Sequence, residues 1–295
     1  MSSDRWTRSR SFQLIIALYL VATSGAIAVA LAIGFDEPLK ALVVGYGVSV
    51  AFLYVASQIV GNGSTFDAWW SVMPPAFAIW LAVESGSTRS WIVAVCAVLW
   101  GLRLTANWAI GWTGLGHEDW RYQMLYEQMP LPRWAVSFTS VHLFPLIVVT
   151  LGSTPMVAVA THESAGGSGL NVLDALAVVL AVTGTALEHF ADVDLRRFNR
   201  VKQPGDVLDR GLWSRCRHPN YLGEMFWWWS LFVFALAADP ETWPVVIGAV
   251  AMTVMFFTAS IPIAEKRSAE RRPGWADYVA RTPLILPRVG SRKAG

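Results

Sequence analysis

The sequence predicts an all-α membrane protein, a polytopic bundle of about eight spanning helices with both termini in the cytoplasm. Of the 295 residues, 54% are apolar and 15% are charged, and the mean hydropathy is +0.43. This composition is too apolar for a soluble domain. Windows of about 17–25 apolar residues, long enough to cross the hydrocarbon core, are expected at residues 12–34, 41–60, 69–83, 90–112, 134–160, 171–191, 221–238 and 242–263.

Two of these windows leave alternatives open. The first follows Arg5, Arg8 and Arg10, as the apolar core of a signal peptide would. It exceeds the usual length of such a core and further spans follow it, so it is kept as a membrane helix. The third is short and contains Pro74-Pro75, which favours a broken or re-entrant segment as the alternative to a full span.

The distribution of basic residues predicts the orientation. Three Lys/Arg residues precede the first span, two lie in 113–133, seven in 192–220 and eight after residue 263, whereas Lys40 and Arg89 lie on the other side. The positive-inside rule therefore places both termini and the 192–220 segment in the cytoplasm. The Gly/Ser-rich stretch Thr161–Gly169 is expected to be a flexible external loop.

Composition also bears on partners. The formal net charge is only +2 and the basic residues lie where topology requires them, so no nucleic-acid partner is expected. Cys96 and Cys216 fall at different levels of the bundle, where a disulfide could not form, and neither has the spacing of a metal ligand. Most of the 16 Trp are expected at the interface or facing lipid. No feature of the sequence indicates an oligomeric state.

The segment Gly211–Glu224 (GLWSRCRHPNYLGE) is the most informative part of the chain. Pro219 is suited to the first position of a helix, whose free N–H groups and positive dipole end would then face the cytoplasm. Arg215 and Arg217 lie just before it, and two guanidinium groups at a helix N-terminus can hold a phosphate group. The alternative is a basic flank of the positive-inside kind.

Two further polar segments are predicted on the same side. The sixth span is expected to continue past the membrane edge, with Asp192 and Arg196 on one face, and to turn at Pro204-Gly205. A solvated helix end is the alternative. After the last span comes Glu265-Lys266-Arg267, which could close over an anionic ligand together with the first basic segment, or lie on anionic lipid.

The N-terminal half supplies candidate groups for a substrate. Arg103 lies within the fourth span and needs a partner there, for which Asp67 is a candidate. Asp67 and Glu118 could orient or polarise a substrate, although helix capping and loop solvation are equally consistent with the pattern.

These residues carry a resemblance. Asp192, Arg196-Arg197-Phe198, Pro204-Gly205, Gly211–Glu224 and Glu265–Tyr278 resemble the C-terminal half of the steroid 5α-reductase superfamily, most closely its bacterial branch of uncharacterised membrane proteins. The resemblance is strong over residues 185–287 and less specific over 60–125. It implies a helical bundle of roughly seven to ten spans that binds NADPH from the cytoplasm and reduces an activated C=C bond in a lipidic substrate. It also implies location in a bacterial inner membrane.

The resemblance further implies a division of the single membrane domain, 1–295, into a substrate-side half, 1–160, and a cofactor-binding half, 171–290. The family's catalytic acid cannot be aligned, so Tyr122, Glu118 or Asp67 is expected to take that role. The cofactor pocket is expected to contain Asp192, Arg196, Arg197, Arg215, Arg217, His218, Asn220, Tyr221 and Glu224, with Lys266 and Arg267 closing it.

Two other functions remain as alternatives. Membrane methyltransferases of the isoprenylcysteine carboxyl methyltransferase type share an R-H-P-x-Y-x-G segment and use S-adenosylmethionine. They typically have a Glu-Glu pair where this chain has Glu265-Lys266, and the Asp192–Phe198 stretch favours the reductases. A non-catalytic binder or transporter is the third possibility, but the hydropathy pattern shows no inverted repeat.

Overall fold

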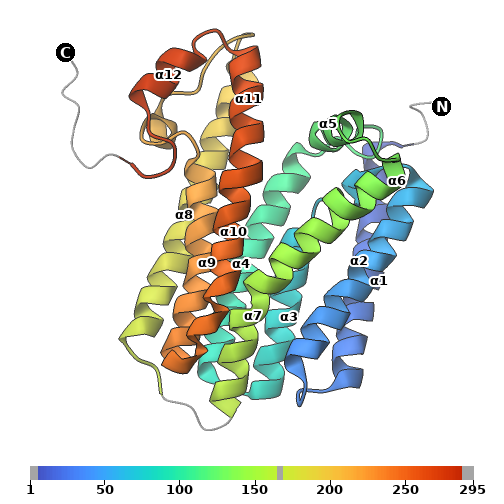
Figure 1. Ribbon diagram of the computed structural model, residues 1–295, viewed down its shortest axis with the longest axis vertical. Helices are drawn as coiled ribbons and strands as arrows, with labels where there is room; N and C mark the ends of the chain where they lie inside the picture. Colours follow the sequence, from blue (N-terminus) through green and yellow to red (C-terminus); the bar gives the residue numbers. More distant parts are fainter. Residues whose placement is uncertain (1–5, 165–168, 288–295) are drawn as a thin grey trace.

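Long helices joined by short turns and short helices make up the computed structural model, which describes residues 6–164 and 169–287 (Figure 1). In that part of the chain seven helices are long and apolar enough to cross a membrane. They are α1 (Arg8–Ile33), α2 (Pro38–Val60), α4 (Thr88–Gly111), the run Arg133–His162, α8 (Val172–Val201), α9 (Pro219–Ala238) and the run Pro240–Arg271. The prediction of a polytopic all-α membrane bundle is confirmed.

Shorter elements complete these runs and cap one end of the bundle. The run Arg133–His162 contains α6 (Arg133–Val136), the π-helical turn η3 (Ser137–Leu143) and most of α7 (Phe144–Ser164). The run Pro240–Arg271 contains η5 (Pro240–Val245), α10 (Val246–Met255), the π-helical turn η6 (Phe256–Ser260) and α11 (Ile261–Arg271). The remaining elements are η2 (Gly63–Phe66), α3 (Trp69–Ser85), α5 (Trp120–Gln128), η4 (Gly211–Ser214) and α12 (Trp275–Arg281).

Helix α3 accounts for the difference between eight predicted spans and seven. It has 17 residues and is continuous through Pro74 and Pro75, so the expectation of a broken segment is wrong. Pro75 has no N–H for the carbonyl of Ser71, and α4 packs closely at this point. A Cβ atom on Gly101 would lie 2.4 Å from that carbonyl oxygen, which explains why α4 carries glycine here.

Helices α8 and α9 are packed at similarly close range and organise the C-terminal half. A Cβ on Gly184 would lie 2.6 Å from the carbonyl oxygen of Gly223, and a Cβ on Gly223 would lie 2.5 Å from that of Gly184. Helix α8 begins with a capping box formed by Asn171 and Asp174. It continues to Val201, well beyond the apolar stretch that predicted it, as expected.

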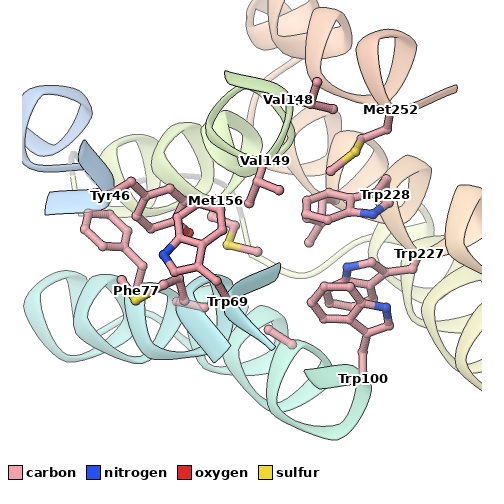
Figure 2. Packing of buried hydrophobic residues seen from close by; sticks show 14 of the residues in the cluster. Tyr46, Trp69, Phe77, Trp100, Val148, Val149, Met156, Trp227, Trp228 and Met252 are labelled. Carbon is pink, nitrogen blue, oxygen red and sulfur yellow. The ribbon is translucent and has the colours of Figure 1, made fainter. Parts of the chain in front are cut away.

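The core is rich in tryptophan. The rings of Trp100 and Trp227 stack with centroids 4.9 Å apart, and Trp228 lies edge-on to Trp100 (Figure 2). Trp69 donates from Nε1 to Ser49 Oγ at 2.9 Å, which satisfies its polar atom inside the bundle. These four indoles are fully buried and face neither lipid nor the interface.

The basic segments gather at one end of the bundle. The start of α1, helices α5, α11 and α12, and the end of α8 lie at the upper end in Figure 1, while the end of α7 and the start of α8 lie at the lower end. Residues 161–164 of the predicted external loop belong to α7, and 165–168 lie outside the described residues. This arrangement agrees with the predicted topology; the assignment of the upper end to the cytoplasm stays a prediction.

Candidate functional site

The start of α9 is held by an acidic residue of α11. Pro219 is the first residue of the helix, as predicted. His218 precedes it, but its side chain makes no capping hydrogen bond; instead Nε2 lies 2.7 Å from Oε1 of Glu265. Its ring also stacks on Tyr221, with centroids 5.3 Å apart and planes within 4°. His218 therefore does not cap α9 but joins α9 to α11.

Arg217 shares the same carboxylate. Its Nε lies 3.2 Å from Oε1 of Glu265, and Nη1 donates to the carbonyl oxygens of Val279 and Thr282 at 3.4 Å. The side chain is only 11% exposed. Arg215 is exposed instead, so the two arginines do not form the joint clamp that the sequence predicted.

A second polar cluster joins α4 to α8. Arg103 forms ion pairs with Glu188, at 2.8 Å, and with Asp192. Asn107 donates from Nδ2 to Asp192 at 2.8 Å, and its Oδ1 accepts a hydrogen bond from Arg196. Asp192 and Arg196 thus lie on one face of α8, as predicted, with Asn107 bridging them.

The expected pairing of Arg103 with Asp67 is wrong. Gly101 contacts α3, the helix that Asp67 precedes. Arg103 follows two residues later, which is about 200° around the helix axis. Its side chain therefore points away from α3 and toward the carboxylates of α8.

Three other predicted residues lie close to these clusters. Glu224 is buried and accepts a hydrogen bond from Nε1 of Trp228 at 3.2 Å. The Oδ1 atom of Asn220 is buried without a hydrogen-bond partner. The guanidinium of Arg267 lies 3.6 Å from the ring centroid of Trp120, which brings α11 against the start of α5. Arg197 and Lys266 are exposed.

A separate pocket of about 210 Å³ lies beside Asp67, between the loop before α3 and the loop before α5. The hydroxyl of Tyr122 donates to Oδ1 of Asp67 at 2.7 Å. Burial raises the pKa of Asp67 from 3.8 to about 6, against the opposing effects of the Tyr122 hydrogen bond and the charge of Arg121. Burial and the charge of Asp67 raise the pKa of Tyr122 well above its ordinary value. The pair therefore combines a proton-holding carboxyl with a phenol that stays protonated.

Glu118, the third candidate acid, has both oxygens engaged elsewhere. Oε1 accepts from the backbone N–H of Gly63 at 2.7 Å, and Oε2 pairs with Arg133 at 2.7 Å. Tyr126 donates to Oε1 at 3.4 Å. These contacts hold the η2 segment against α5 and α6, so the geometry favours a structural task for Glu118.

Comparison with known proteins places the chain in a family. Residues 53–282 match the family described as "Protein of unknown function (DUF1295)". The chain belongs to this DUF1295 family. It is 28% identical over 269 residues to an uncharacterized protein of Schizosaccharomyces pombe, an alignment that covers 80% of this chain and 76% of the relative. No solved structure matches.

Membership in DUF1295 supports the predicted resemblance only in its general sense, as a steroid 5α-reductase-like membrane family. The relative is fungal, so this comparison does not support the bacterial branch. The matched residues extend across both of the expected halves and include both polar clusters and the Asp67 pocket.

The sequence of this DUF1295 protein indicates Glu265 and Asn107 as polar residues of these segments but not the partners that they hold. Glu265 belongs to the segment that is expected to close over an anionic ligand, yet in the structure it holds both Arg217 and His218. Asn107 lies four residues after Arg103, on the same helix face, and that spacing was the available signal for a shared partner.

Proposed function

We propose that this protein is a membrane-embedded, NADPH-dependent reductase that acts on an activated C=C bond of a lipidic substrate. The observation that carries the proposal is the convergence of residues from α8, α9 and α11 at one end of the bundle. Asn220, the second residue of α9, has a buried Oδ1 atom without a hydrogen-bond partner. A buried acceptor without a hydrogen bond costs free energy, so a hydrogen-bond donor group of a bound ligand would fit at this position.

The residues present suit NADPH. Within the described residues, Arg197, Arg215 and Lys266 are exposed cations that form no ion pair, and they are available to phosphate groups. Asn220 and Glu224 are suited to the amide of the nicotinamide, since they offer both an acceptor and a carboxyl group. When bound, NADPH supplies a hydride.

The chain's own acid in this proposal is Tyr122. Its hydroxyl is protonated across the physiological range, and Asp67, whose pKa is about 6, can hold and return a proton through their 2.7 Å hydrogen bond. A proton donated by Tyr122 would complete the reduction of the C=C bond at the α-carbon. The apolar walls of the bundle fit a lipidic acceptor better than a water-soluble one.

Equilibrium titration distinguishes this proposal from the S-adenosylmethionine alternative. Purified full-length protein in nanodiscs is titrated calorimetrically with NADPH and separately with S-adenosylmethionine. The proposal expects binding of NADPH only. Binding of S-adenosylmethionine without any affinity for NADPH would refute it and favour a methyltransferase.

A matched pair of variants locates the site. Arg217→Lys keeps the charge but loses the planar fork, so the affinity for NADPH should fall by about tenfold. Arg210→Lys, at an exposed position of the same loop, should leave the affinity unchanged. Equal affinity in both variants would mean that Arg217 binds only Glu265 and the carbonyl oxygens of Val279 and Thr282, and not the cofactor.

A further inference from the structure

An apolar groove of about 370 Å³ runs between α4 and α8 on the outside of the bundle. Its rims are Leu99, Val182 and Phe190, whose exposed fractions are 57%, 55% and 60%, so the groove opens toward lipid. The small residues Ala181 and Ala186 leave the space between the two helices unfilled. The two helices that line the groove, α4 and α8, are both long and apolar enough to cross a membrane, so the groove is reached from the bilayer.

The groove ends at a buried cation with a free donor. Arg103 lines it, and the Arg103 side chain is only 9% exposed. Its Nη atoms contact Glu188 and Asp192, but Nε is buried and has no hydrogen-bond partner. A buried N–H without an acceptor is costly and calls for an oxygen atom at that position.

The charges at this end select the kind of oxygen. The carboxyl groups of Glu188 and Asp192 already face the guanidinium of Arg103, and a second guanidinium, of Arg196, joins the cluster through Asn107. Two carboxyl groups and two guanidinium groups are thus already matched, so a further anionic group, such as a carboxylate or phosphate, would find no unpaired cation and would lose its hydration in the bilayer. A neutral carbonyl oxygen can accept from Nε–H without this cost.

We propose that the lipidic substrate enters laterally through this groove, with its apolar chain between α4 and α8 and a neutral carbonyl oxygen bound to Nε–H of Arg103. The proposal rests on the proposed function in taking the ligand as the substrate of that reaction. Arg103 pairs directly with Asp192, a residue of the expected cofactor pocket. Entry at this point therefore brings the carbonyl end of the lipid to the edge of that pocket.

Photo-crosslinking tests the occupancy of the groove. The probe is a long-chain α,β-unsaturated ketone with a diazirine at the far end of its chain. It is photolysed with the full-length protein in phosphatidylcholine nanodiscs without NADPH, and the labelled peptides are mapped by mass spectrometry. Label should concentrate on Cys96 and Val182, which line the groove about two helical turns away from Arg103 and Glu188. Even labelling of other lipid-facing positions, such as Leu102 and Leu176, would overturn the proposal.

Competition tests the carbonyl contact. An excess of the unlabelled ketone should suppress groove labelling at a concentration about tenfold lower than the alkane of the same length requires, the difference expected from one hydrogen bond to a buried cation. The carboxylate of the same chain length and the alkane should compete much less. Equal competition by the carboxylate would overturn the selection of a neutral oxygen at Arg103.

A matched pair of variants provides a control for folding. Ala186→Trp fills the groove and should abolish the preferential labelling, whereas Thr183→Trp, at an exposed position of α8 that does not line the groove, should preserve it. Labelling that survives Ala186→Trp would refute the site. Because the assay needs neither cofactor nor turnover, failure of NADPH binding would refute the proposed function and leave the groove result intact.

Discussion

Replacing Asp67 with asparagine should stabilise the fold above pH 6. The pKa of this carboxyl rises from 3.8 to about 6 because burial disfavours its charged form. Since one pKa unit corresponds to about 1.4 kcal/mol, this difference corresponds to about 3 kcal/mol of free energy of unfolding. The side chain is half-buried beside an open pocket, so access of water makes this value an upper limit.

The direction of the pH dependence is fixed by the raised pKa. Below about pH 4 the Asp67 carboxyl is protonated in both the folded and unfolded states and costs nothing. Between about pH 4 and pH 6 the unfolded state loses the proton first, so the wild type loses stability as the pH rises. Above pH 6 the carboxyl is charged in both states, and the loss in free energy of unfolding caused by its burial no longer changes with pH. Asparagine keeps an oxygen that accepts from Tyr122 and has no such dependence.

Thermal unfolding in detergent micelles, followed by tryptophan fluorescence from pH 4 to pH 8, measures the effect. Asp67→Asn should match the wild type near pH 4 and unfold at a higher temperature at pH 8. Asp36→Asn, which removes a charge at an exposed position between α1 and α2, provides the control. Parallel pH profiles for wild type and Asp67→Asn would refute the reasoning. If the proposed reduction is then measurable, its loss in Asp67→Asn alongside the gain in stability would show that Asp67 is kept for function.

Three further predictions follow from the contacts. Tyr122→Phe should lower the turnover of an enone substrate by about 100-fold or more, as expected for loss of a general acid, and leave NADPH affinity unchanged in calorimetry. Gly223→Ala should lower the free energy of unfolding by about 1–3 kcal/mol, because its Cβ atom would meet α8. Gly25→Ala, whose Cβ atom would meet nothing within 4 Å, should not lower it, and chemical denaturation measures both variants. Asp174→Asn removes the carboxylate that pairs with Nε and Nη2 of the fully buried Arg89 and should cost about 3 kcal/mol in the same assay.

The sequence was sufficient to predict the spanning helices and their common end because these depend on local composition. Hydropathy identifies a long apolar run, and proline at residue 219 marks a helix start, without any knowledge of neighbouring helices. The continuity of α3 could not be predicted in this way. It depends on Gly101, which lies on another helix and allows α4 to pack beside the freed carbonyl of Ser71.

The members of each polar cluster were mostly predictable, but their pairing was not. Arg103 had several carboxylates within the same half of the membrane, and only its position two residues after Gly101 directs it to Glu188 and Asp192. Similarly, Glu265 comes 47 residues after His218 in the chain, and their contact depends on how α11 crosses α9. Such crossings arise from side-chain packing over the whole bundle.

The π-helical turn η6 explains part of this packing. Pro262 has no N–H to donate to the carbonyl of Thr258, and the chain widens into η6 immediately before it. A π-helical turn carries one extra residue, so it shifts the faces of α11 relative to those of α10. Phe256 in this turn packs on Tyr221, with ring centroids 5.1 Å apart, while Glu265 beyond it reaches His218. The proline of α11 thus helps to bring a carboxylate to the start of α9, a link between sequence and site that an ideal α-helical period would not reveal.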